Sequence, residues 1–208
     1  MSPTKKPRKR AKPEKVLVLR SCTGKMKCCE GGDHKPFTWP AKGPVACKDW
    51  KPDAECGNGL HGLLWGEGDG SLIAYGGDTK WLVVEVLASE IVDLKGKVKF
   101  PRGRVVFCGT PDDAGKWLAA RAPGRAIVRG TATAGDRGTA TAGYGGTATA
   151  GVRGTATAGD GGEIRVRWYD QAAGRYRVTV GYAGEDGIKP NVAYVIREKK
   201  LTEKAGAP

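Results

Sequence analysis

An eight-residue unit is repeated four times without interruption between Gly130 and Gly161, as GTATAGDR, GTATAGYG, GTATAGVR and GTATAGDG. A short perfect period constrains the fold strongly, because each unit can bury its apolar face only against neighbouring units. The alternation of threonine and alanine is that of a short strand, so the two residue types point to opposite faces. A glycine and a turn pair follow each strand, and glycine permits the positive φ that a tight corner needs.

The repeat also has a longer period of two units. Arg137 and Arg153 end the first and third units, whereas Gly145 and Gly161 end the second and fourth. Two units per coil would stack identical strands on each other and give a flat, two-faced β-solenoid. Four units then make two coils, about 10 Å thick at about 4.8 Å per strand layer. So small a stack needs a cap at each end.

The residues after the repeat continue its register. In Gly162-Glu163-Ile164-Arg165-Val166, the two aliphatic side chains fall at the alanine positions of the repeat, and the two charged ones fall at the threonine positions. The sequence therefore predicts that the alanines face inward and the threonines outward. It also predicts that the interior side chains become larger where the stack is closed.

The stretch GTATAGYGGTATAG is similar to the octapeptide repeat of bacterial ice-nucleation proteins, including its T-x-T strand and A-G-Y-G turn. With residues 59–70, 81–86 and 184–191, the chain also resembles repeat proteins of unknown function encoded by phages and prophages of high-GC bacteria. That resemblance covers nearly the whole chain except the basic N-terminus, and it implies an origin and an architecture. Threonine rows of this kind resemble ice-binding solenoids, but two coils offer only a small face, so ice binding is not favoured.

The remaining sequence predicts a chain that is mainly β. Residues 81–86 are a strand because Val83, Val84 and Val86 are β-branched, and residues 111–121 are a helix with two aspartates in its first turn. We therefore expect an α+β N-terminal domain, a short two-coil β-solenoid of octapeptide repeats and a capping β-hairpin. The expected segments are a disordered basic tail at residues 1–15, the α+β domain at 16–124, the solenoid at 125–161, the capping hairpin region at 162–197 and a charged tail at 198–208.

Positive charge is the main signal for a partner. The net charge is +13, and the first fifteen residues contain seven Lys or Arg and a single Glu. Residues 163–169 and 175–180 are predicted to form a β-hairpin around a loop of residues 170–174. Pairing the two strands across this loop places the arginines on one face and the apolar residues on the other. Arginine binds phosphate well because its planar fork donates two hydrogen bonds. The predicted nucleic-acid-binding residues are Lys5, Lys6, Arg8, Lys9, Arg10, Lys12, Arg165, Arg167, Arg175 and Arg177. The alternative is a solvated face that nearby carboxylates partly neutralise.

The sequence supplies no catalytic set and no metal or cofactor motif. The six cysteines and two histidines lack C-x2-C and H-x3-H spacing, so no metal site is predicted. His61 stands among glycines, and the layout around it is only faintly similar to ADP-ribosyltransferase domains. No P-loop or dinucleotide-binding glycine motif is present. We therefore expect no cofactor, and no residue is assigned as catalytic.

These observations lead to one main hypothesis and two alternatives. The main one is a non-enzymatic phage or prophage accessory protein that binds nucleic acid or a nucleoprotein complex and interferes with a host defence system. With no secretory signal and no membrane-spanning segment, it is expected in the cytoplasm, without a membrane partner. One alternative is an enzyme of ADP-ribosyltransferase-like layout in residues 16–124. The other is a protein-interaction or self-assembly module that forms homo-oligomers through the solenoid edge.

Overall fold

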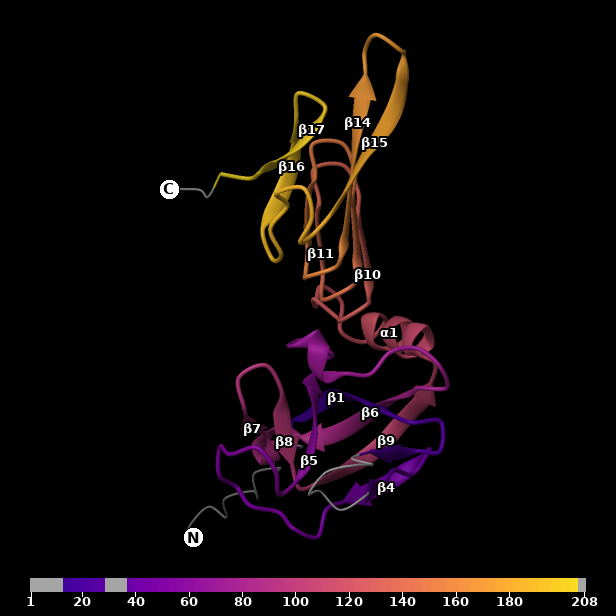
Figure 1. Cartoon of the computed structure of the whole chain (residues 1–208), viewed down its shortest axis with the longest axis vertical. Coiled ribbons are helices and arrows are strands. Elements are labelled where there is room, and N and C mark those ends of the chain that lie inside the picture. Colours follow the sequence, from indigo (N-terminus) through magenta and orange to yellow (C-terminus); the bar gives the residue numbers. More distant parts are fainter. Residues whose placement is uncertain (1–12, 29–36, 206–208) are drawn as a thin grey trace, which may run out of the picture.

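The computed structural model describes residues 13–28 and 37–205. The expectation of a mainly β protein is confirmed, because 45% of the described residues are in strands and 8% in helices. Figure 1 shows an elongated molecule, with the sheet that contains β1 (Lys15–Cys22) at one end and a narrow column of strands at the other end. Residues 1–12, which make up most of the predicted basic tail, lie outside the described residues.

The larger part is an antiparallel sheet of seven strands in the order β4-β9-β6-β1-β5-β8-β7. Its strands are β4 (Gly43–Ala46), β9 (Arg102–Gly109), β6 (Lys80–Leu87), β1 (Lys15–Cys22), β5 (Leu60–Leu64), β8 (Val98–Phe100) and β7 (Val92–Asp93). The central strands are apolar on both faces: Val18 and Leu19 of β1, and Val83 and Val84 of β6, are fully buried. Both faces of this sheet are therefore covered.

Different elements cover the two faces. One face packs around Val84 and Phe100, with Trp39 over them. The other packs Leu19 and Trp81 against helix α1 (Pro111–Ala119).

Helix α1 starts at Pro111, as predicted for the helix over residues 111–121. Thr110 caps this end, because its hydroxyl accepts a hydrogen bond from the Asp113 N–H at 3.2 Å. A two-stranded ribbon of β2 (Lys27–Cys28) and β3 (Phe37–Thr38) and the short 3-10 helices η1 (Gly70–Leu72) and η2 (Ala88–Glu90) complete this part.

The four repeat units form four strands, which we call the repeat stack: β10 (Thr131–Ala134), β11 (Thr139–Ala142), β12 (Thr147–Ala150) and β13 (Thr155–Ala158). Pairing joins every second unit in parallel, β10 with β12 and β11 with β13, as the two-unit period predicts. The register continues into β14 (Glu163–Asp170), where Ile164 lies opposite Ala148 and Val166 opposite Ala150. The downstream register prediction is confirmed.

Alanine side chains fill the interior of the repeat stack. Ala148 and Ala156 are fully buried, as are Ile164 and Val166 at the closing end. The threonines mostly face outward, but Thr155 is 7% exposed and so departs from that rule. The inward position of the alanines is thus confirmed.

The corner geometry differs from the prediction. The residue with positive φ is the eighth of each unit, with φ of 58° at both Arg137 and Arg153, and not the glycine that follows the strand. That glycine is needed for a different reason. A Cβ on Gly151 would lie 2.5 Å from the backbone nitrogen of Asp136 in the first unit, and a Cβ on Gly159 would lie 2.5 Å from that of Tyr144 in the second. Close approach of the paired units therefore requires this glycine in the third and fourth units.

One tyrosine joins the repeat stack to the seven-stranded sheet. Tyr144 occupies the turn position that is Asp136, Val152 or Asp160 in the other units, and its ring stacks on Tyr75 with centroids 6.3 Å apart. A Cβ on Gly70 would lie 2.3 Å from the Tyr144 ring, so the contact also requires a glycine. The junction is thus specific to the second unit.

Two further strand pairs close the column. β14 pairs with β15 (Arg175–Tyr182), while β13 pairs with β16 (Ala193–Arg197), which in turn pairs with β17 (Lys200–Glu203). Residues 200–203, within the predicted charged tail at 198–208, form the last of these strands. In Figure 1 the β14–β15 hairpin extends beyond the repeat stack.

Candidate self-association surface

The hairpin register separates the four arginines that were predicted to share a face. Residues directly opposite each other in an antiparallel pair lie on the same face. Arg165 lies opposite Val180 and Arg167 opposite Val178, whereas Arg177 lies opposite Trp168. The prediction is wrong because the loop has four residues, 171–174, instead of five. A shift of one residue moves every side chain of one strand to the other face.

Contacts within the hairpin engage three of these arginines. The Arg177 Nε donates to the Asp170 carboxylate at 2.6 Å, which holds the pKa of that carboxyl below its usual value. Arg165 donates to Glu163 at 2.9 Å, and the Arg167 guanidinium lies 3.9 Å from the centre of the Tyr176 ring. The other predicted nucleic-acid-binding residues, Lys5, Lys6, Arg8, Lys9, Arg10 and Lys12, lie outside the described residues. No concentrated arginine face exists on this hairpin.

The face that holds Arg165 and Arg167 instead carries large exposed apolar side chains, which we call the hairpin strip. Its members are Tyr169, Tyr176, Val178, Val180 and Tyr182, which are 41–53% exposed. Within the described part of the chain, Leu72 is the only other large apolar side chain exposed to this degree. Contiguous exposed apolar side chains on a soluble fold indicate an interaction surface. The period-two pattern of residues 175–180 was visible in the sequence, but the wrong hairpin register placed its apolar residues on the face opposite all four arginines.

The strip lies on a strand with an open edge. β15 is the last strand in the order β10-β12-β14-β15, so one of its sides has no strand neighbour in this sheet. Such an edge presents backbone N–H and C=O groups that can pair with another strand. The outward threonines continue the same face, because Thr147 lies opposite Glu163 and Thr149 opposite Arg165.

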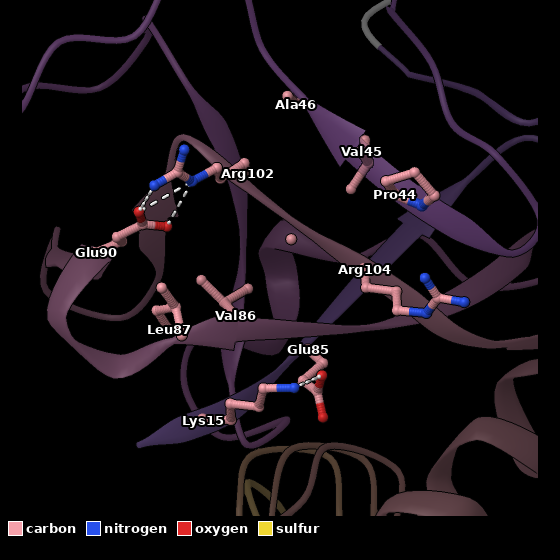
Figure 2. Close-up of a pocket in the computed structure, with 11 residues that line it drawn as sticks. Lys15, Pro44, Val45, Ala46, Glu85, Val86, Leu87, Glu90, Arg102 and Arg104 are labelled. Atoms are coloured by element: carbon pink, nitrogen blue, oxygen red, sulfur yellow. Dashed lines mark hydrogen bonds and ion pairs between the residues drawn. The ribbon is translucent and has the colours of Figure 1, made fainter. Parts of the chain in front are cut away.

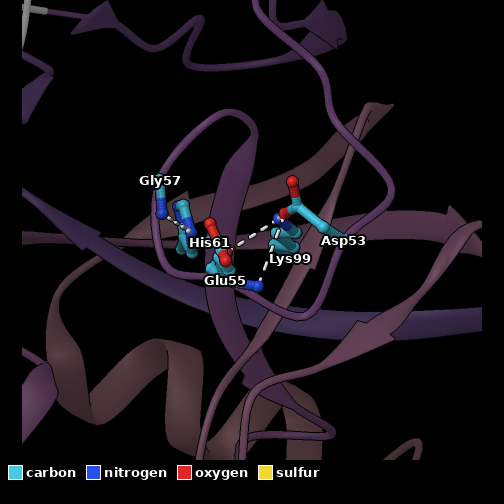
Figure 3. A network of polar contacts seen from close by, with 5 residues as sticks. All are labelled: Asp53, Glu55, Gly57, His61 and Lys99. Atoms are coloured by element: carbon cyan, nitrogen blue, oxygen red, sulfur yellow. Dashed lines mark hydrogen bonds and ion pairs between the residues drawn. The ribbon is translucent and has the colours of Figure 1, made fainter.

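His61 lies in a cluster of polar groups with Gly57, Lys99 and Asp53 (Figure 3). Its Nε2 accepts a hydrogen bond from the Gly57 N–H at 3.4 Å, and the neighbouring Lys99 ammonium is bound by the Asp53 carboxylate and the Glu55 carbonyl oxygen (Figure 3). Burial, reinforced by the positive charge of Lys97, lowers the pKa of His61 to about 4. The imidazole is therefore neutral near pH 7.

Burial also affects three thiols of the seven-stranded sheet and its loops. Burial raises the pKa of Cys22 to about 11, and it raises the pKa values of Cys47 and Cys108. A thiol protonated at neutral pH is a poor nucleophile and a poor metal ligand. Among the described residues, no group of three His, Cys, Asp or Glu side chains is placed to hold a metal ion.

A shallow hollow of about 460 Å³ lies between β4, β6 and β9 (Figure 2). Its charges are largely paired: Lys15 donates to Glu85 at 2.7 Å, and Arg102 binds Glu90 through two nitrogens. These two pairs neutralise four of the five charged residues that line the hollow, and the fifth is Arg104. Exposed pairs of this kind also contribute little to stability.

Comparison with known proteins finds similarity over two parts of the chain. Residues 16–112, most of the seven-stranded sheet, match a family described as "Domain of unknown function (DUF7666)". Similar proteins are named ice nucleation protein. The one from Xanthomonas campestris pv. translucens is 43% identical over 112 residues, 53% of this chain and 7% of that protein. Ice nucleation protein InaU of Pantoea ananas is 40% identical over 109 residues, 51% of this chain and 10% of that protein.

The match is therefore to a small portion of much longer proteins, since the chain spans a tenth or less of the length of these relatives. The chain carries an ice-nucleation-like repeat, as the resemblance of its octads implied. No solved structure matches it significantly. Over the described ranges, no helix has both the length and the apolar character required to cross a bilayer.

These comparisons correct the main functional hypothesis. The relatives are named for ice nucleation, and none is a phage accessory protein that binds nucleic acid or counters a host defence. The expected cytoplasmic location is contradicted as well, because the relatives that the chain matches are named ice nucleation proteins. The interaction-module alternative agrees better with the relatives.

Proposed function

We propose that this chain is a non-enzymatic repeat module that self-associates through the hairpin strip and the open edge of β15. In this proposal residues 125–161 are a two-coil β-solenoid, residues 162–197 cap it, and residues 16–124 form an α+β domain that holds its other end. The observation that carries the proposal is the combination of an unpaired strand edge with five exposed apolar side chains on one face of the same hairpin.

The sequence of β15 is suited to pairing with a second copy of itself. An antiparallel two-fold pairing centred on Thr179 would place Tyr176 opposite Tyr182 and Val178 opposite Val180. It would place Arg177 opposite Gly181, so no two like charges would lie directly opposite each other. A closed two-fold interface of this type is the commonest in homo-oligomers, and it joins two β14–β15 faces into one continuous sheet.

Burial of the strip would supply the driving force. The paired strands would bury the flanks of neighbouring strip side chains against each other, and each such cross-strand pair contributes roughly 0.2–1 kcal/mol. Tyr169 and Tyr176 already form an edge-to-face pair with centroids 5.0 Å apart, which gives the strip a rigid aromatic end. Rigid aromatic side chains lose little conformational freedom when they are buried in an interface.

Sedimentation velocity over a concentration series tests the proposal. We expect dimers or larger species for the full chain and a monomer for Val178→Lys, because a charged residue on a strand edge opposes pairing. The control is Leu72→Lys, which makes the same kind of change at an exposed apolar residue outside the strip and should leave association intact. A full chain that stays monomeric at millimolar concentration, or equal effects of both variants, would refute the proposed surface.

A second candidate, ice binding, rests on the threonine rows. Thr131 and Thr147 lie side by side in register, as do Thr133 and Thr149, on one outer face of the repeat stack. Because the relatives are named for ice nucleation, thermal hysteresis of the full chain is the appropriate measurement. Hysteresis that disappears in Thr147→Lys but persists in Val178→Lys would support this candidate. No hysteresis in any variant would exclude it.

A further inference from the structure

The seven-stranded sheet contains a large cavity that self-association does not use. Its volume is about 970 Å³, and it lies among β1, β5 and the loops at residues 46–49 and 56–59. Small-molecule sites occupy about 300–1,000 Å³, so this cavity is at the upper end of that range. It belongs to residues 16–112, the part that matches a family of unknown function.

The cavity opens where β1 separates from β5. β1 pairs with β6 along its whole length to Cys22, but it pairs with β5 only at Val18 and Leu19. Arg20, the next residue of β1, lines the cavity together with His61 of β5. The guanidinium of Arg20 is thus held at a gap in the sheet by a strand that is rigidly paired on its other side.

Arg20 lacks partners in this position. Its Nε is buried and makes no hydrogen bond. Among the described residues, no carboxylate forms an ion pair with it. Buried donors are normally satisfied, and a charged donor left unsatisfied is costly, so a missing partner requires an explanation. A bound anion would provide that partner.

The rest of the lining has an excess of positive charge. Lys48 and Lys97 also line the cavity, and Asp49 is the one carboxylate among the described lining residues. The Lys97 ammonium donates to the Cys56 sulfur at 3.0 Å, and sulfur is a weak acceptor that an anionic oxygen could replace. The electrostatics of the cavity therefore favour a negatively charged ligand.

Aromatic side chains form another wall. Phe37 and Trp39 line the cavity and pack edge to face, with ring centroids 5.3 Å apart. Trp39 is fixed further by its indole N–H, which donates to the Cys28 sulfur at 3.4 Å. An apolar wall beside a few convergent polar groups is the usual composition of a small-molecule site.

We propose that this cavity binds a small organic anion. One carboxylate or phosphate group pairs with Arg20 and Lys97, and an apolar or aromatic portion packs against Phe37 and Trp39. The inference does not depend on self-association, because the cavity and the hairpin strip share no residue.

His61 provides a readout inside the cavity. Burial and the charges of Lys97 and Arg20 disfavour its protonated form. A bound anion would offset those charges, so the pKa of His61 should rise when the site is occupied. NMR titration of the imidazole can follow this rise in the presence of each ligand.

The test is isothermal titration calorimetry of the full chain with phenyl phosphate and with benzoate, whose relative affinities distinguish phosphate from carboxylate recognition. We expect at least one of them to bind, and inorganic phosphate and benzyl alcohol to bind about tenfold or more weakly. Arg20→Gln should weaken binding about tenfold or more. Arg104→Gln is the matched control, since Arg104 lines the separate hollow of Figure 2, and it should change the affinity less than about twofold.

Several results would overturn the inference. They are no binding of either anion at millimolar concentration, no movement of the His61 pKa, equal losses in Arg20→Gln and Arg104→Gln, or inorganic phosphate binding as tightly as phenyl phosphate. If Arg20→Gln does not fold, Lys97→Gln is used instead, because Lys97 is half-exposed. It should also weaken binding about tenfold or more. Repeating the titration in Val178→Lys separates the two proposals, because that variant should lose association and keep the anion site.

Discussion

The seven-stranded sheet and the repeat stack stabilise their strands in different ways. The sheet packs large side chains such as Trp81 and Phe100 against both faces of its central strands. The repeat stack packs alanine against alanine, and a Cβ on the glycine after its second, third or fourth strand would lie 2.3–2.5 Å from backbone atoms. The stability of the sheet, which has large buried side chains, should therefore be most sensitive to removal of a side chain. The stability of the repeat stack, which has small ones, should be most sensitive to enlargement of a side chain.

The largest expected effect is loss of volume in the sheet. Trp81 is fully buried, and its indole N–H donates to the Ala74 carbonyl at 2.9 Å. Trp81→Ala should destabilise the protein by about 3–5 kcal/mol, because it leaves a cavity and an unsatisfied carbonyl. Urea denaturation followed by circular dichroism measures the loss. A cost below about 1 kcal/mol would show that this core tolerates voids, and the contrast would fail.

Added volume in the repeat stack should have the next largest effect. Ala156 is fully buried between the two sheets of the stack. Ala156→Leu should destabilise the protein by about 1–3 kcal/mol through overpacking. The control is Thr133→Val, a change on the outer face of β10 that should cost less than about 0.5 kcal/mol. A stabilising Ala156→Leu would mean that the stack has unfilled space.

A pH dependence distinguishes the two regions further. The pKa of His61 in the sheet is lowered to about 4, so between pH 6.5 and pH 4 the unfolded chain binds a proton that the folded chain does not. Stability should therefore fall as the pH falls through this window. The loss should be about 1–2 kcal/mol once the partial exposure of the ring is allowed for. The repeat stack has no histidine and should not contribute.

The comparison of wild type with His61→Gln by urea denaturation at pH 6.5, 5.5 and 4.5 tests this assignment. The variant should lose less stability across the series than the wild type. Parallel curves for the two proteins would show that His61 is not the titrating group.

The smallest expected effect is at the junction between the regions. Tyr144→Asp gives the second unit the residue found in the first and fourth, and it removes the stack on Tyr75. An aromatic pair contributes about 0.5–1.5 kcal/mol, so we expect a loss of that order and faster proteolysis near residues 125–130. Val152→Asp makes the corresponding change in the third unit, away from the junction, and should change neither quantity. Similar cleavage rates in the two variants would contradict the role of Tyr144.

The wrong arginine face and the missed cavity share a physical cause, because both depend on how segments distant in the sequence are placed relative to each other. The arginines at positions 165, 167, 175 and 177 alternate as expected, but a loop shorter by one residue moved one pair to the other face. The anion cavity was not predicted, because Arg20, Trp39, His61 and Lys97 lie in separate segments and share no local motif. The register at Ile164 and Val166 was predictable because it needs only continuity with the preceding unit.

The sequence by itself determined the local periodicities: the two-unit pairing, the inward alanines, the capping residues Ile164 and Val166, and the start of α1 at Pro111. These follow from side-chain alternation and from short-range hydrogen bonds, which neighbouring residues specify. Only the tertiary structure decided the face of each hairpin arginine, the contact of Tyr144 with Tyr75, and the convergence of Arg20 and His61 on one cavity. These depend on loop length and on packing between distant segments, and no local pattern in the chain encodes them.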